Sequence, residues 1–333
     1  MAMPLESPIS FTNVGRIRWW QRGIFASQTG YVLLALAMLL VVMHFASPYF
    51  FTEGNMQNVA KNFSFIAIAT LGVTFVIITG GIDLSVGSMI ALTTVAIALA
   101  LKAGFGPAPA AAIGIGVSAL CGLINGVLIT QLKVVPFIVT LGTMLIVRGA
   151  AKGLADERRI EAPFTWLNDL LRTQHGAALL PAGIWGVLGA AVAIAALLRY
   201  TRFGRHVFAI GSNERMARLC GVAITRTKIA VYTLSGLLTG AAGLLQFSKL
   251  SVGDPTVGVG AELDVIAAVI IGGGSLTGGR GSVAGTIMGA AIMTIIQIGC
   301  SQKGLANWVQ QIVTGAIIVA AVALDRVRSA KGR

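Results

Sequence analysis

The chain has 333 residues, of which 56% are hydrophobic and only 11% are charged. A soluble domain carries about a quarter charged residues, so this composition excludes a protein whose whole surface faces water. The net charge of +13 would suit a nucleic-acid partner, but the basic residues gather at the ends of apolar runs and in short loops, where the positive-inside rule explains them. We therefore expect an integral membrane protein that contacts membrane lipid and no nucleic acid.

Ten apolar runs recur along the chain, and a helix needs roughly 20 apolar residues to cross a hydrocarbon core of about 30 Å. The eighth run is too short for an ordinary span. The sequence therefore predicts an all-α integral membrane protein with about ten transmembrane segments, some of them short or broken. The ten runs are Thr29–Ala46, Phe63–Thr79, Ser85–Leu101, Ala108–Thr130, Pro136–Ala151, Pro181–Leu198, Ile229–Phe247, Glu262–Ile271, Ser282–Cys300 and Leu305–Leu324.

Basic residues predict how these segments lie across the membrane. The segment Arg199–Lys228 has seven Lys or Arg against one Glu and is expected in the cytoplasm, whereas the loop Lys152–Leu180, with balanced charges, is expected outside. Residues 1–28 and 326–333 are expected to be cytoplasmic tails, and residues 29–325 a single transmembrane domain. The tails contain Arg16, Arg18, Arg22, Arg326, Arg328, Lys331 and Arg333.

Two segments of similar sequence suggest two weakly repeated halves. VIITGGIDLSVGSMIAL at Val76–Leu92 and VIIGGGSLTGGRGSVAG at Val269–Gly285 each place glycines and a polar turn between apolar stretches. Interrupted helices of this kind meet near the translocation path of transporters, where irregular backbone finds hydrogen-bond partners. Two similar cytoplasmic turns are the alternative. The candidate gating residues are Gly80, Gly81, Asp83, Ser85, Gly273, Gly274, Gly279 and Arg280.

Asp83 lies in the first of these interruptions, where a carboxylate at the edge of the hydrocarbon needs a partner or water. It either stabilises the N-terminus of the helix that begins near Ser85 or takes a direct part in gating. The second interruption approaches the G-x-x-x-x-G-K-[ST] pattern of phosphate-binding loops, but Arg280 and Gly281 stand where Lys and Ser or Thr are required. We therefore expect this chain to bind no cofactor and no ATP.

Groups that hold metals or carry out catalysis are scarce. His44, His175 and His206 are scattered, and no carboxylate stands near them at a metal-binding spacing. We therefore expect neither a metal site nor a catalytic site, and the chain is not expected to be an enzyme. Two amides on apolar stretches, Asn125 and Gln297, either line a path for a polar solute or form hydrogen bonds between helices.

The predicted cytoplasmic segment contains a short amphipathic helix. Asn213 suits an N-cap and Gly221 a C′ position, which predicts a helix over Glu214–Cys220. Ahead of it, Gly204 and Gly211 are expected to break the chain. Such a helix fits a groove on a partner protein, and a lipid-facing interfacial helix is the alternative. Its apolar face is predicted to consist of Met216, Leu219 and Cys220.

Three separated motifs carry a resemblance to a known family. GGIDLSVGS, TRFGRHVFAIGSNERMARLCGV and ELDVIAAVIIGGGSLTGGRGSVAGT closely resemble segments of the permease subunits of bacterial ABC-type sugar importers, the group of ribose and xylose systems. The likeness runs from about Phe50 to Leu324. It implies a multi-pass protein of the bacterial inner membrane that works as a homodimer or with a related permease. It also implies a cytoplasmic ATPase subunit that binds ATP and Mg²⁺, a periplasmic sugar-binding protein, and a monosaccharide substrate.

The resemblance further implies that the segment 199–228 docks the ATPase. An ion-coupled secondary transporter of a small polar solute is the alternative function. Such a transporter needs ionisable groups along its path, but the acidic residues near the apolar runs all fall at predicted helix ends. The expected docking residues are Arg202, Gly204, Arg205, Gly211, Asn213, Glu214, Arg218 and Gly221.

Overall fold

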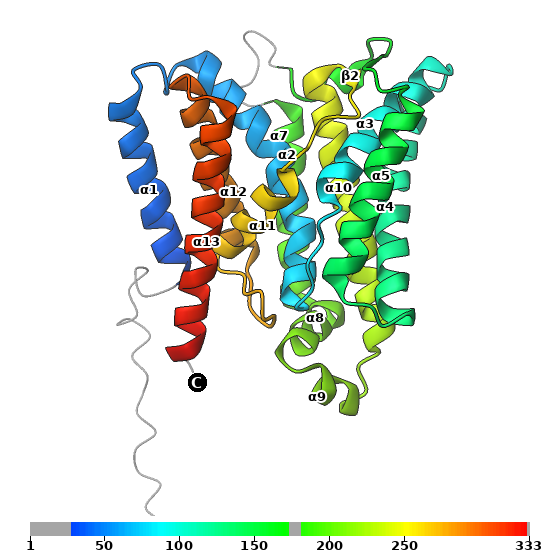
Figure 1. Ribbon diagram of the computed structural model, residues 1–333, viewed down its shortest axis with the longest axis vertical. Helices are drawn as coiled ribbons and strands as arrows, with labels where there is room; N and C mark the ends of the chain where they lie inside the picture. The colour runs from blue at the N-terminus through cyan, green and yellow to red at the C-terminus, as the bar shows by residue number, and fades with distance from the viewer. Residues whose placement is uncertain (1–27, 173–180, 332–333) are drawn as a thin grey trace, which may run out of the picture.

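A computed structural model describes residues 28–172 and 181–331 (Figure 1). The predicted N-terminal tail up to residue 27, part of the predicted outer loop, and residues 332–333 lie outside the described residues. The helices are α1 (Gln28–Ala46), α2 (Glu53–Ile78), α3 (Val86–Lys102), α4 (Pro107–Gln131), α5 (Pro136–Leu154), α6 (Trp166–Asp169), α7 (Ala182–Tyr200), α8 (Arg202–Ser212), α9 (Glu214–Leu219), α10 (Ile224–Leu250), α11 (Ala261–Ile271), α12 (Val283–Gln302) and α13 (Asn307–Lys331), and the strands are β1 (Ile160–Glu161) and β2 (Val252–Gly253).

Each of the ten predicted apolar runs corresponds to one helix, in the expected order: α1 to α5, α7, and α10 to α13. Seven described helices are long and apolar enough to cross a membrane, and α3 and the apolar part of α13 are shorter. α11, the eighth predicted segment, has only 11 residues. The prediction of an all-α membrane protein with some short segments is therefore confirmed.

The core is built around α2, whose residues from Ile66 to Ile78 are all buried. α2 packs against α10, α12, α11 and α7, and a helix that is apolar on every side requires such enclosure. Helices nearer the outside, α1, α5 and α7, instead expose large apolar side chains such as Val42, Ile146 and Val192. These side chains suit contact with the hydrocarbon of a membrane.

Two connections without helix or strand run into the bundle. The first leads from α2 to α3, so that α3 begins part-way along the bundle, and the second leads from β2 to α11 and enters from the opposite end (Figure 1). Each contains a glycine with positive φ, Gly80 at 77° and Gly258 at 74°. Two units with interrupted helices that enter from opposite ends are typical of transporters with two related halves.

The second interruption does not lie where the sequence similarity placed it. Val269–Gly285 comprises the end of α11, a turn, and the start of α12, and this turn lies against Gly80, on which a Cβ would lie 3.7 Å from the carbonyl oxygen of Thr277. Residues 254–260 form the second connection, mostly as turns. Their sequence, DPTVGVG, has no apolar run and no double glycine to reveal it. The two similar motifs are turns that meet each other.

The end of the bundle opposite α8 and α9 carries a small sheet in which β1 pairs antiparallel with β2. Next to it, Nε of Arg159 donates to Oδ2 of Asp254 at 2.9 Å. The amide of Asp254 also donates to Oγ1 of Thr94 on α3 at 3.2 Å. These contacts fix the start of the 254–260 connection to the described part of the predicted outer loop and to α3.

Candidate functional site

α8 and α9 project from the lower end of the bundle in Figure 1. Gly204, Val207 and Ile210 recur every three residues along α8 and are buried, whereas Arg202 and Arg205 are exposed. This spacing gives α8 one face that packs and a second, basic face that stays accessible.

The predicted breaks at Gly204 and Gly211 are wrong, because α8 runs without interruption from Arg202 to Ser212. Both glycines permit close packing instead. A Cβ on Gly204 would lie 2.6 Å from the Cα of Leu198, and one on Gly211 would collide with the backbone of two other segments. Glycine can mark a break in the chain, but it also occurs where one backbone closely approaches another.

α9 has the ends that the sequence predicts. Oδ1 of Asn213 accepts a hydrogen bond from the amide of Met216 at 3.0 Å. At the other end, Gly221 has a φ of 82°, and its amide and the next one donate back into the last turn at 3.0 Å each. This pattern is a Schellman motif. The predicted helix is confirmed, with Leu219 as its last residue.

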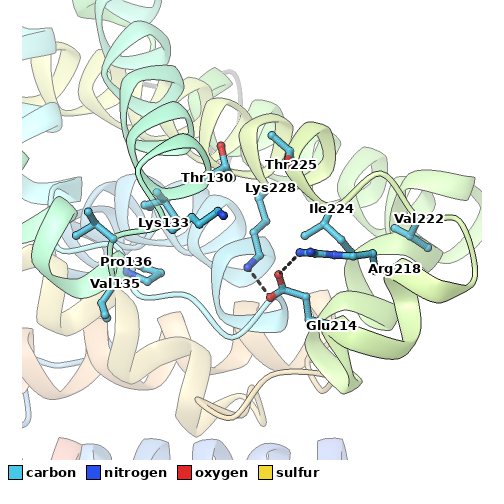
Figure 2. A pocket seen from close by; sticks show the side chains of 12 residues that line it. Thr130, Lys133, Val135, Pro136, Glu214, Arg218, Val222, Ile224, Thr225 and Lys228 are labelled. Atoms are coloured by element: carbon cyan, nitrogen blue, oxygen red, sulfur yellow. Dashed lines mark hydrogen bonds and ion pairs between the residues drawn. The ribbon is translucent and has the colours of Figure 1, made fainter.

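Glu214 forms two ion pairs at the start of α9 (Figure 2). Its carboxylate lies 3.6 Å from the guanidinium of Arg218 and 2.7 Å from Nζ of Lys228 on α10. The first pair has the favourable i, i+4 order, and the second connects α9 to the start of α10. No sequence pattern predicts Lys228 as a partner of Glu214, because it lies 14 residues away in another helix.

The exposed surface of α9 combines apolar and basic side chains. Met216 is 54% exposed and Leu219 is 80% exposed, and the neighbouring Cys220 is also exposed. Arg215 and Arg218 are exposed beside them. Apolar side chains rimmed by charge are typical of a protein or membrane interaction site.

α8 meets two other segments by direct backbone contact, which we call the glycine junction. The amide of Gly279 donates to the carbonyl of Ile78, the last residue of α2, at 2.8 Å. A Cβ on Gly211 would collide with both of these groups, and a Cβ on Gly278 would lie 2.8 Å from the carbonyl oxygen of Gly211. The ends of α8 and α2 and the turn 272–282 therefore touch without intervening side chains.

Other predicted gating residues lie near this junction. A Cβ on Gly80 would lie 3.7 Å from the carbonyl oxygen of Thr277, and one on Gly81 would lie 2.5 Å from the Tyr232 hydroxyl. The structure thus brings the glycines of both motifs together. The same turn contains the buried Gly273 and Gly274 and the exposed Arg280.

Asp83 and Ser85 lie inside the bundle in a hydrogen-bonded network. Oδ1 of Asp83 accepts from the amide of Ser85 at 3.0 Å and from its Oγ at 2.5 Å. Nδ2 of Asn125 on α4 donates to Oγ of Ser85 at 3.0 Å, and Oγ1 of Thr143 on α5 donates to Oδ1 of Asn125 at 2.7 Å. All four side chains are buried, so the network joins α4 and α5 to the start of α3.

Gln297 is half-buried on α12, with its side chain close to that of Asp264 on α11. On α5, Nη1 of Arg148 donates to the carbonyl oxygens of Pro255 and Val257 at 3.0 and 2.6 Å. The sequence analysis missed Arg148 and the Thr143 hydroxyl, because no spacing along the chain connects them with partners on other segments.

Comparisons with known proteins agree with this architecture. Residues 55–322 match the family described as branched-chain amino acid transport system / permease component. The ribose import permease protein RbsC of Escherichia coli (strain K12) is 38% identical over 297 residues, which cover 88% of this chain and 92% of that protein. RbsC of Bacillus subtilis (strain 168) is 38% identical over 305 residues, covering 89% of this chain and 92% of its own.

The L-arabinose transport system permease protein AraH of Escherichia coli (strain K12) is 34% identical over 323 residues, covering 96% of this chain and 94% of that protein. No solved structure matches the chain. Because the family match spans most of the sequence and the relatives align along nearly their whole lengths, this chain belongs to the family of transport-system permease components.

Proposed function

We propose that this chain is the membrane-spanning permease subunit of an ATP-driven importer for a monosaccharide or a similar small polar solute. The family is described by amino acid cargo, but relatives at 34–38% identity are named for ribose and L-arabinose. Those names favour a sugar. The location is then a bacterial inner membrane, with ATP and Mg²⁺ bound by a partner subunit.

The observation that carries the proposal is the accessible basic and apolar surface of α8 and α9. Arg199, Arg202, Arg205, Arg215 and Arg226 are exposed at this end of the bundle, and the positive-inside rule assigns such an end to the cytoplasm. The beginning of α1 and the end of α13 lie at the same end of the bundle as α8 and α9 (Figure 1). A cytoplasmic ABC ATPase therefore has a surface on which to dock.

The glycine junction suggests how docking changes the transmembrane segments. ATP shifts the partner between two states, and it does so only through different affinities for them. A displacement of α8 would pass directly to the end of α2 and to the turn 272–282, because backbone contacts backbone there. The end of α2 leads into the first interrupted unit and the turn 272–282 borders the second, so both units respond to the same ATPase.

The opposite end of the bundle is assigned to a periplasmic sugar-binding protein. A second permease subunit, identical or related, completes the membrane complex. Asn125 and Gln297 are candidates for contact with the solute along the path, since an amide both donates and accepts hydrogen bonds to sugar hydroxyls. For Asn125 this requires release from Ser85 or Thr143 in one state of the cycle.

An ion-coupled transporter is the second candidate function. Asp83 is buried, and its Oδ2 atom has no hydrogen-bond partner among the described residues. A carboxylate of this kind inside a membrane protein is a feature of ion-coupled transport.

Proteoliposomes separate the two functions. The chain is reconstituted with the ATPase and the binding protein encoded in the same genome. Uptake of labelled ribose, arabinose and xylose is then measured either with ATP on the side of the ATPase or with an imposed proton or sodium gradient. Uptake with ATP alone supports the importer. Uptake by the isolated chain under a gradient without ATP supports the secondary transporter.

A further inference from the structure

A groove of about 590 Å³ lies between α9, the turn that joins α4 to α5, and the start of α10 (Figure 2). It is open on one side. Its polar side chains are those of Thr130, Lys133, Glu214, Arg218, Thr225 and Lys228.

The groove carries an excess of positive charge. Its lining has three cations, Lys133, Arg218 and Lys228, and one carboxylate, Glu214, which leaves a net charge of +2 (3 − 1). Glu214 pairs with Arg218 and Lys228, whereas Lys133 has no ion pair or side-chain hydrogen bond among the residues that the structure describes. Figure 2 shows the ammonium groups of Lys133 and Lys228 pointing into the groove. The free charge therefore suits an anion.

The groove also lies at the level of lipid headgroups. α4 has 25 residues and α10 has 27, so at a rise of about 1.5 Å per residue both exceed a hydrocarbon core of about 30 Å. Their ends at the groove consequently reach the interface. Beside it, Leu132, Val135 and Ile138 are 64%, 59% and 59% exposed. Cations next to exposed apolar side chains match a ligand that has a phosphate and acyl chains.

We propose that this groove binds the phosphate headgroup of an anionic phospholipid from the surrounding membrane. Lys133 contacts the phosphate, Lys228 and Arg218 share it with Glu214, and the acyl chains run along the exposed apolar residues of the α4–α5 turn. Basic pockets between transmembrane helices bind anionic headgroups in this way. Because the headgroup competes with Glu214 for Lys228, its binding would weaken the contact that holds α9 to α10.

The test needs no transport and does not depend on the proposed function. The full chain is purified in a neutral detergent, and binding of short-chain phosphatidylglycerol, phosphatidylcholine and inorganic phosphate is measured by native mass spectrometry and by the thermal unfolding midpoint. The variants are Lys133→Gln and Lys228→Gln. Arg226→Gln is the matched control, because it removes one charge from an exposed side chain at the same end but outside the groove lining.

We expect saturable binding of phosphatidylglycerol that raises the unfolding midpoint, about fivefold weaker after loss of either lysine, and unchanged in Arg226→Gln. Equal binding of phosphatidylcholine, equal weakening in the control, or an effect of inorganic phosphate as strong as that of the lipid would each overturn the proposal. So would full retention of phosphatidylglycerol binding in Lys133→Gln.

Discussion

Gly211 occupies a helical position at which any side chain would collide with the carbonyl of Ile78 and the amide of Gly279. We expect Gly211→Ala to destabilise the protein by about 1–3 kcal/mol, the usual effect of overpacking, and to reduce transport further by opening the glycine junction. Gly149→Ala is the control, since nothing lies within 4 Å of a Cβ there. Denaturation in mixed micelles measures the stability of both variants, and equal stability would contradict the tight contact at Gly211.

The buried network around Asn125 gives a second prediction for single residues. Asn125→Ala leaves the hydroxyls of Ser85 and Thr143 without this partner, at a cost of about 1–3 kcal/mol for an unsatisfied buried group. Thr143→Val removes one hydrogen bond with little change in shape. The two substitutions share a bond, so the double variant should be less destabilised than the sum of the single variants. Strict additivity in the same denaturation assay would exclude the coupling.

At the scale of elements, α9 depends on its caps because a helix of six residues has little stability of its own. Asn213→Ala removes the bond to the amide of Met216 and should cost about 1 kcal/mol. We expect faster hydrogen exchange in α9 and weaker association with the ATPase. Asn213→Asp keeps the acceptor and should behave like the parent protein. If Asn213→Ala exchanges at the parental rate, the cap does not maintain α9.

The sheet of β1 and β2, which is the outer sheet in the proposed orientation, gives an element-scale prediction for pH. Burial opposes the charge on Asp254, but hydrogen bonds from Thr256 and the charge of Arg159 outweigh it, so its pKa lies below the ordinary value of 3.8. A lowered pKa in the folded state contributes stability above the ordinary value and loses it as the pH falls through the folded value. Asp254→Asn should therefore make the stability of the sheet of β1 and β2 less dependent on pH in the acid range.

Limited proteolysis of the outer loop against pH measures this loss. Asp169→Asn is the control, because Asp169 forms an exposed pair with Arg172 at 3.7 Å and such pairs contribute little. Parallel acid profiles for the parent protein and Asp254→Asn would show that the Arg159 contact does not hold the sheet.

The helices were predictable because apolar length alone reveals a membrane span, and the ends of α9 because Asn213 and Gly221 have local roles. Contacts between segments that are distant in the sequence were not predictable. The packing role of Gly211 was not predictable because its neighbours, Ile78 and Gly279, are remote in sequence, and that of Gly204 because its neighbour Leu198 lies on another helix. The connection 254–260 was not predictable because a segment of consecutive turns without an apolar run has no periodic signature.

At the scale of the whole molecule, one connected route leads from end to end. Asp254 and Arg159 fix the start of the second connection at the sheet of β1 and β2. α11 follows this connection, and the turn 272–282 then meets α8 at the glycine junction. Because the short helix α11 joins them, a change at one end of the bundle can reach the other end. Such coupling requires that an element on the route has two populated arrangements. This route is consistent with docking at α8 and α9 as the input.

The most direct test of the central claim, that α8 and α9 dock the ATPase, is co-purification of the ATPase with a charge-reversed surface. Arg205→Glu with Arg215→Glu reverses two exposed arginines that have no ion pair among the described residues. Arg158→Glu with Arg172→Glu reverses two exposed arginines at the opposite end, of which Arg172 forms only the exposed 3.7 Å pair with Asp169. We predict that the first variant loses at least about tenfold in ATPase association while staying folded, and that the second retains it. Full ATPase recovery with the first variant would contradict the account.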